Sequence, residues 1–209
     1  MTVEFKDLGL VVFAEVLAIQ EQLVAAVFNG SAPETVLLLE HLPVYTMGHG
    51  GSEENILDPN VKAVRINRGG DITYHGPGQL IGYPIIDLGR RGRDLHRYLR
   101  FLEELIMAVA GDFQVEACRV PGRTGVWTDS GKLASIGVGV RRWKTMHGFA
   151  LNVNTDLNGF AGIHPCGIAA CPVTSLERLA GQPIPMSNVK AAVRELFVPL
   201  LNEQLPVYT

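Results

Sequence analysis

The sequence predicts an α+β protein, sandwich-like in its layers, in which helices pack on a mixed, largely antiparallel sheet. Separated helical segments are mixed with strand-like runs instead of alternating with them as regular βαβ units. Turn residues also separate several short strand-like runs between residues 115 and 154, which favours antiparallel hairpins. The chain has 209 residues, so we expect one domain over residues 1–209 with a core of its own.

The first half of the chain contains one predicted helix and three predicted strands. Apolar residues recur at helical spacing over residues 14–28, with Val16 and Ile19 on the apolar face. Residues 34–40, ETVLLLE, form a short apolar run that is typical of a buried strand. Two further strand-like runs, VKAVRIN and LIGYPIIDL, flank a loop that is rich in Gly.

The second half begins with a predicted amphipathic helix over residues 94–110. Asp94 is the expected N-cap, and Gly111 lies just past the expected end. Four strand-like runs follow, namely VEACRV, GVWTDS, KLASIGVGVRR and HGFALNVN. The segment Asp129-Ser130-Gly131 predicts the turn between the second and the third of these runs.

Helices close the chain. Thr174 and Glu177 have the spacing of a capping box and predict the start of a short helix. Ser187 is the expected cap of the last helix, whose apolar stripe includes Val189 and Val193. A weak shift in composition near residue 170 leaves open a small annex there.

Composition excludes several classes of function. Hydrophobic residues make up 47% and charged residues 19%, as in an ordinary globular protein. The net charge of −3, with scattered Lys and Arg, argues against a nucleic-acid partner. No apolar run is long enough for a membrane span, and the first residues do not have the pattern of a secretory signal. The three Cys residues show neither disulfide-type nor zinc-type spacing, so we expect a reducing cytoplasm and no metal.

The most distinctive segment is the loop from Arg68 to Gln79, RGGDITYHGPGQ. Five of its twelve residues are Gly or Pro, a composition that often lets the main chain approach a ligand. Arg68 adds a permanent cation and His75 a titratable imidazole. The alternative interpretation, a tight connection between two strands, stays open from this segment alone.

A second candidate is Cys166, in GIHPCGIAA. Pro and Gly flank it, so we expect it in a turn that a substrate can reach, where a thiolate would be a strong nucleophile. Its activator is left open among His75, His147 and Lys132, because sequence alone does not bring distant residues together. From local sequence alone, Lys132 is more simply a solvated turn lysine, and Cys171 is more simply a bystander than a resolving thiol.

Other catalytic motifs are missing from the sequence. It has no GxxxxGK[ST] phosphate loop, no GxSxG nucleophile elbow and no HExxH helix, and no GxGxxG opens a helix. The dispersed His41, His49 and His96 do not indicate metal ligands.

Taken in order, RGGDITYHGPGQLIGYPIIDL, GKLASIGVGV, HGFALNVN and PCGI resemble the signature segments of the lipoyl(octanoyl) transferase family, and EHLPVYTMGHGG resembles its early segment. The resemblance covers about residues 36 to 177. It implies a fold similar to the catalytic module of biotin and lipoate protein ligases. It also implies transfer of an octanoyl or lipoyl group from acyl carrier protein to a Cys thioester, and then to a specific lysine of a lipoyl domain.

Carried onto this chain, the resemblance implies Cys166 as nucleophile and Lys132 as the assisting lysine. The segments that match the acyl-binding parts of the family contain Arg68, Gly69, Gly70, Asp71, Ile72, Thr73, Tyr74, His75, Ser135, Ile136, Gly137, Gly148, Phe149 and Ala150. Backbone N–H groups of the Gly-rich loop or of the Cys166 turn are expected to stabilise the oxyanion. No cofactor is implied.

The implied partners are octanoyl-acyl carrier protein as donor, and the lipoyl domains of 2-oxo acid dehydrogenases and the glycine cleavage protein as acceptors. A monomer is expected. Because acyl carrier proteins are acidic, a basic surface is a candidate docking site, formed by Arg90, Arg91, Arg93, Arg97 and Arg100. The alternative, that these arginines only form the solvated face around the helix over residues 94–110, is at least as well supported by the sequence. The rival functions are an ATP-dependent lipoate or biotin protein ligase, a non-catalytic binding module and a Cys thioesterase.

Overall fold

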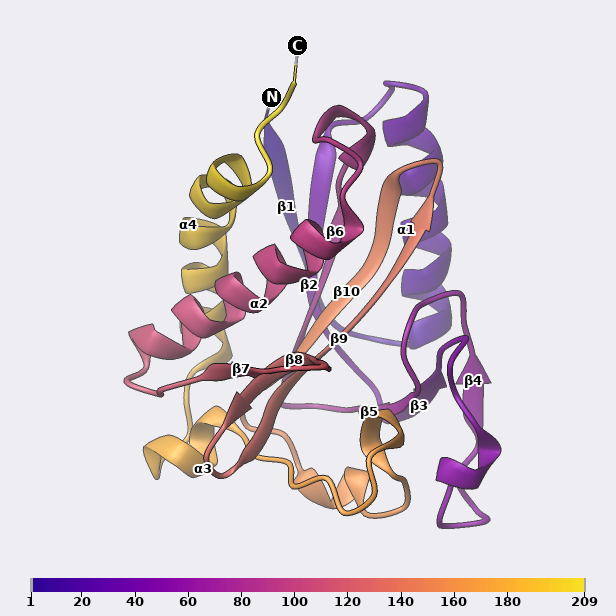
Figure 1. Cartoon of the computed structure of the whole chain (residues 1–209), viewed down its shortest axis with the longest axis vertical. Coiled ribbons are helices and arrows are strands. Elements are labelled where there is room, and N and C mark those ends of the chain that lie inside the picture. The colour runs from indigo at the N-terminus through magenta and orange to yellow at the C-terminus, as the bar shows by residue number, and fades with distance from the viewer. Residues whose placement is uncertain (1, 209) are drawn as a thin grey trace.

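The computed structural model describes residues 2–208 and has a seven-stranded sheet at its centre (Figure 1). β1 runs parallel to β2, and every other neighbouring pair is antiparallel, which confirms the predicted mixed, largely antiparallel sheet. In sheet order the strands are β1 (Val3–Val11), β2 (Glu34–His41), β6 (Gln79–Ile85), β10 (Lys144–Asn152), β9 (Gly131–Arg141), β8 (Arg123–Thr128) and β7 (Cys118–Val120).

A smaller sheet comes from the chain between β2 and β6. Its order is β4 (Ala63–Arg65), β3 (Val44–Met47) and β5 (Ile72–His75), with β3 parallel to β4 and antiparallel to β5. Figure 1 shows it beside the lower part of the main sheet, on the side where α1 lies. The prediction of one continuous loop over residues 68–79 is therefore wrong in its middle, because β3 supplies a pairing partner for β5.

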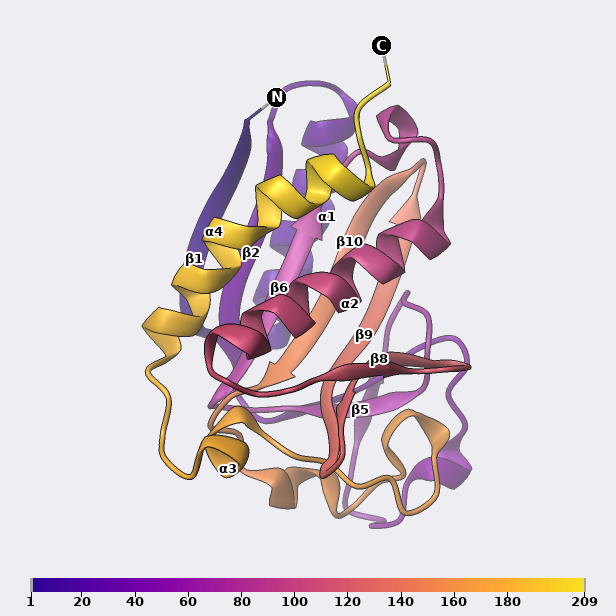
Figure 2. The same ribbon diagram turned by 60° about the vertical axis from the view of Figure 1, so that its left-hand side comes forward.

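Helices cover both faces of the main sheet. α1 (Phe13–Phe28) packs on one face, and α2 (Leu95–Asp112) and α4 (Met186–Gln204) lie across the other (Figure 2). The largest apolar core lies under α2 and α4, where the rings of Phe101 and Phe197 meet edge to face at 5.1 Å. Because β2 is covered on both faces, its apolar run is buried almost throughout, as the sequence predicts.

Short helices lie in the segments that connect the longer elements. α3 (Leu176–Ala180) precedes α4, and 3-10 turns are formed by η1 (Glu53–Asn55), η2 (Leu88–Arg90), η3 (Leu157–Phe160) and η4 (Pro165–Gly167). Among residues 2–208, every helix is too short or too polar to traverse a bilayer.

Several local predictions can be compared with these boundaries. Asp94 caps α2 as expected, because its carboxylate accepts from the N–H of Arg97 at 2.9 Å. The other two predicted caps are wrong: α4 begins at Met186 after Pro185 with no side-chain cap, and Ser175 instead of Thr174 caps α3. β1 and β3 are strands that the sequence pattern did not predict, and α2 runs past Gly111 to Asp112.

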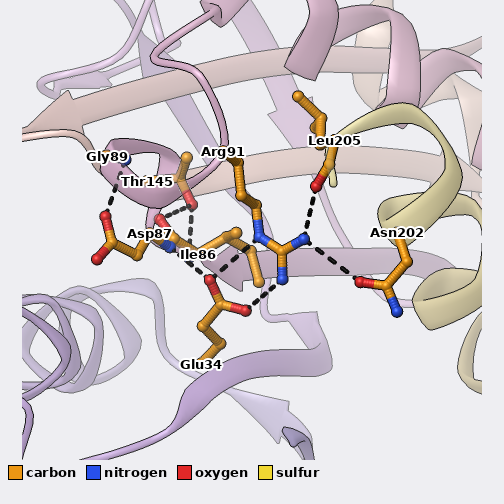
Figure 3. Close-up of polar contacts among 8 residues, drawn as sticks. All are labelled: Glu34, Ile86, Asp87, Gly89, Arg91, Thr145, Asn202 and Leu205. Atoms are coloured by element: carbon orange, nitrogen blue, oxygen red, sulfur yellow. Dashed lines mark hydrogen bonds and ion pairs between the residues drawn. The ribbon is translucent and has the colours of Figure 1, made fainter. Parts of the chain in front are cut away.

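Arg91 lies in the interior, which corrects its place in the predicted basic surface. Its guanidinium pairs with Glu34 at 2.8 Å, and the two side chains are 2% and 6% exposed (Figure 3). The same guanidinium donates to the carbonyl of Leu205 at 2.7 Å. Arg91 therefore ties the start of β2 to the segment after α4 and is not available to a partner protein.

Candidate active site around Cys166

Cys166 occupies a strained turn. It sits inside η4 with φ 57° and ψ 26°, the left-handed region that costs a non-glycine residue about 1–3 kcal/mol. Its side chain is half-buried. The predicted turn is thus observed, and the sulfur of Cys166 lies beside side chains of β9.

Two side chains of β9 meet that sulfur. Lys132 Nζ donates to Cys166 Sγ at 2.8 Å, and Ser135 Oγ lies 3.9 Å from the same sulfur. Lys132 is only 2% exposed, so it is not a solvated turn lysine. An ammonium at this distance can stabilise a thiolate and exchange protons with a group bound at the sulfur.

A β-bulge explains how Lys132 and Ser135 reach one sulfur. In a regular strand, residues three apart point to opposite faces. Between β8 and β9 the register shifts, so that Val126 pairs with Ala134 while Trp127 pairs with Lys132. The extra residue is Leu133, which is buried with Ala134 in the core under α2. The bulge therefore turns Lys132 to the face that carries Ser135.

The backbone of Lys132 is held from both sides. Its N–H donates to Pro172 at 2.8 Å, and its carbonyl accepts from the N–H of Thr174 at 3.0 Å. The chain that follows η4 thus returns alongside the first residues of β9, and Val173 forms a bridge with Lys132. Nearby, Cys171 is half-buried, and burial raises the pKa of its thiol.

The loop that contains η1 supports the Cys166 turn. The N–H of His164 donates to the Asn55 carbonyl at 2.8 Å, and Asn55 Nδ2 donates to Asp71 Oδ2 at 2.6 Å. Gly167 passes so close to this carboxylate that a Cβ there would lie 2.7 Å from Asp71 Oδ2. Asp71 therefore joins the Gly-rich loop to the turn of Cys166.

A small pocket opens beside Cys166, between β5 of the small sheet and β6, β9 and β10 of the main sheet. Of the predicted substrate-binding residues, it brings together Arg68, Gly70, Asp71, Thr73, His75, Ser135, Ile136, Gly137, Gly148, Phe149 and Ala150.

Three predicted residues do not line the pocket. Ile72 and Tyr74 point to the opposite face of β5, where they pack with Phe160 in a separate small core. Strand alternation requires this, because Thr73 and His75 face the pocket. Gly69 instead ties the loop to β9, since its N–H donates to Val138 at 2.8 Å.

Two pocket residues were missed, Ile66 and Tyr83. Tyr83 lies in the apolar run of β6, and its hydroxyl hydrogen-bonds with His41 Nε2 at 3.0 Å. A Tyr inside a buried strand needs a hydrogen-bond partner for its hydroxyl. The presence of Tyr83 in an apolar run was therefore the sequence signal for a polar group beside this strand. His41 is thus a buried, satisfied residue, while His49 bonds Asn67 at the surface and His96 is exposed.

Arg68 is a buried cation in this pocket. Its guanidinium donates to the Thr46 carbonyl at 2.8 Å and to the Gly69 carbonyl at 2.9 Å. Burial lowers the pKa of Arg68, and the neighbouring Cys166 opposes that shift. The positive charge therefore faces the pocket near the sulfur.

The two pocket histidines are neutral at physiological pH. Burial lowers the pKa of His75 to about 3 and that of His147 to about 4. His75 bonds Thr46 and Gln79, whereas both ring nitrogens of His147 are buried without a hydrogen-bond partner in the described chain. Neither imidazole is a strong base, so of the three candidate activators Lys132 has the right contact. Over residues 2–208, no group of three or more His, Cys, Asp or Glu side chains is arranged to hold a metal ion.

Comparison with known proteins identifies relatives along almost the whole chain. The model of the family described as "Lipoyl protein ligase A/B catalytic domain" matches residues 13–198. An octanoyltransferase of Geobacter metallireducens is 64% identical over 201 residues, which cover 96% of this chain and 94% of that protein. One of Geotalea uraniireducens is 66% identical with the same coverage of both chains.

Solved structures share the fold at low identity. A putative lipoate protein ligase from T. acidophilum superposes with a TM-score of 0.73 at 15% identity, covering 98% of this chain and 85% of that one. Biotin protein ligase from Aquifex aeolicus gives a TM-score of 0.55 at 13% identity, covering 97% and 69%. These likenesses confirm the architecture expected from the sequence.

Proposed function

The chain belongs to the lipoyl protein ligase A/B catalytic-domain family and is an octanoyltransferase of protein lipoylation, and we propose that it passes the octanoyl group through a thioester on Cys166. The single observation that carries this proposal is the 2.8 Å contact from Lys132 Nζ to Cys166 Sγ at the mouth of the pocket. A ligase that activates a free acid with ATP has no need of such a pair.

In the first half-reaction, the Cys166 thiolate attacks the carbonyl carbon of the donor thioester. The bond to the donor sulfur breaks, and the departing thiolate takes a proton from the Lys132 ammonium. In the second, the acceptor lysine amine attacks the Cys166 thioester and loses a proton to the now neutral Lys132. The amide forms, and Cys166 leaves as a thiolate, which restores the starting state. The donor and the Cys166 intermediate are both thioesters and the final amide is more stable, so the two-step reaction needs no ATP.

Backbone donors for the oxyanion are restricted by the geometry. The N–H of Gly69 is engaged with Val138, and that of Gly167 with His164. We therefore exclude these two groups from the expected oxyanion donors in the Gly-rich loop and the Cys166 turn. The cation of Arg68 supplies further electrostatic stabilisation to charge that develops near the sulfur.

The proposed donor is octanoyl-acyl carrier protein, and the proposed acceptors are the lipoyl domains of 2-oxo acid dehydrogenases and the glycine cleavage protein. Residues 1–209 form one catalytic domain in this proposal, because α4 packs back on α2 and β6. The proposed oligomeric state is a monomer. A reducing cytoplasm is the proposed compartment, since Cys166 must stay a free thiol. Of the candidate arginines for the acidic carrier, Arg90, Arg93 and Arg97 are exposed, whereas Arg100 also pairs with Glu103 at 2.6 Å.

The test is intact-protein mass after incubation with octanoyl-acyl carrier protein. Wild type should gain one hydroxylamine-labile octanoyl group, and Cys166→Ala should gain none, whereas Cys118→Ala, a change at an exposed thiol, should behave as wild type. Lys132→Met should slow adduct formation by about 10²-fold or more, the loss typical of general acid–base catalysis. If octanoylation of a lipoyl domain proceeds in Cys166→Ala, or requires free octanoate and ATP, the proposal is wrong.

A further inference from the structure

The side chain of Lys132 lies in an enclosure formed by Trp127 and Gly125 of β8, which face it beside Cys166. Its Nζ is 5.2 Å from the centroid of the Trp127 ring, and Trp127 is only 4% exposed. The two residues are directly paired across β8 and β9, at the bulge that turns Lys132 toward the sulfur. The ammonium is thus placed between a hydrogen-bond acceptor, Cys166 Sγ, and the face of an indole.

Gly125 forms another wall of this enclosure. A Cβ at this position would lie 2.9 Å from Lys132 Cε and 3.4 Å from Nζ, and its φ of +127° is one that L side chains rarely adopt. The N–H of Gly125 donates to Glu103 Oε1 at 3.2 Å. Glu103 is 1% exposed and is fixed by Arg119 at 3.1 Å, so α2 anchors the strand that faces Lys132.

We propose that Trp127 and Gly125 are positioning residues, which hold the Lys132 ammonium against Cys166 Sγ. The inference rests on the proposed thioester route. The indole face attracts a cation and has no such attraction for a neutral amine, so it favours the charged ammonium form of Lys132 beside the sulfur. The missing Cβ of Gly125 leaves room for the end of the Lys132 side chain, and for the Ala134 carbonyl oxygen, which would lie 2.7 Å from such a Cβ.

Other charged groups around the pair are compatible with this role. Arg123 lies 5.6 Å from the same Trp127 ring, and burial raises the pKa of the Cys171 thiol while the charge of Lys132 opposes that shift. Glu103 is already neutralised by two arginines and meets the enclosure only through the backbone of Gly125. Within the described chain, no carboxylate forms an ion pair with Lys132, which leaves the thiolate and the indole face as its stabilising contacts.

The experiment measures Cys166 reactivity directly, in a Cys118→Ser and Cys171→Ser background where only Cys166 can be alkylated. The iodoacetamide rate at pH 7 is compared with octanoyl transfer for Trp127→Leu and Trp127→Phe. Trp127→Leu should lower both rates by about fivefold or more, the loss expected for a desolvated cation–π contact. Trp127→Phe, which keeps an aromatic face, should recover most of the loss.

Trp143→Leu, at an exposed position in the turn between β9 and β10, is the matched control and should leave both rates unchanged. Gly125→Ala should lower both rates, while Gly122→Ala, with open space around its Cβ, should not. Equal rates in wild type and a folded Trp127→Leu would overturn the proposal, as would a Phe variant no better than Leu. If Leu does not fold, Trp127→Met takes its place. Failure of the thioester route would instead appear as transfer in Cys166→Ala, whatever the alkylation rates.

Discussion

At the scale of single residues, backbone conformation sets where the Cys166 sulfur lies. The residue is held in the left-handed region by its neighbours, and Gly167 follows it with φ +70°. Two consecutive left-handed residues make a narrow turn, and this turn packs against Asp71 without room for another side chain. Gly167, which has no side chain, therefore helps to fix the position of Cys166 beside the pocket.

We expect Gly167→Ala to impair transfer far more than it impairs stability. Its Cβ would collide with the Asp71 carboxylate and displace Cys166 from Lys132, lowering the transfer rate by about tenfold or more, as small misplacements of reacting groups do. The matched control is Gly181→Ala, which has φ +72° but open space around its Cβ. Both should lose about 1–2 kcal/mol of unfolding free energy in urea, since alanine is strained in this region. Equal activity in the two variants would contradict the prediction.

At the scale of elements, irregular features place the functional groups. The bulge between β8 and β9 turns Lys132 to the pocket face, and the insertion between β2 and β6 builds a second sheet whose strand β5 forms the opposite wall. The ends of elements are joined by buried ion pairs. Arg91 and Glu34 connect the turn η2, the start of β2 and the segment after α4 (Figure 3).

Arg91→Met should reduce the unfolding free energy by about 3–5 kcal/mol, because it leaves the Glu34 carboxylate buried without its partner. The double variant with Glu34→Gln should recover part of that loss. Arg65→Met is the control. Its ion pair with Glu53 joins side chains that are 58% and 79% exposed, so the loss of this pair should change the unfolding free energy by no more than the experimental error. Urea denaturation at pH 7 measures the unfolding free energy of the wild type and of the three variants. A loss for Arg91→Met no greater than that for Arg65→Met would show that the buried pair does not join these elements.

At the scale of the whole molecule, the fold surrounds its pocket with histidines that are kept neutral. Burial lowers the pKa of His75 and His147, and also that of His41, below the usual value near 6.5. Below pH 6.5 the unfolded chain therefore binds more protons than the folded chain. Stability must fall as the pH decreases from about 6.5 toward the folded-state pKa values of about 4 and about 3.

Between pH 7.0 and pH 5.5, the neutral imidazoles of His75 and His147 should each cost about 1 kcal/mol of unfolding free energy. His147→Gln should reduce the difference in stability between these two pH values by about that amount. His96→Gln, a change at an exposed position of α2, should leave it unaltered. The measurement is urea denaturation at both pH values. A wild type equally stable at both would contradict the neutral assignment of the pocket histidines.

Sequence alone determined what depends on short-range pattern. Helical spacing located α1, α2 and α4, the apolar run located β2, and Pro and Gly around Cys166 indicated its turn. The tertiary structure decided which amine meets that sulfur, since Lys132 and Cys166 are 34 positions apart and meet only through a bulge. It also decided that Arg91 is interior and that Ile72 and Tyr74 face away from the pocket. These outcomes depend on pairing between distant strands, and local periodicity has no information about which strands will pair.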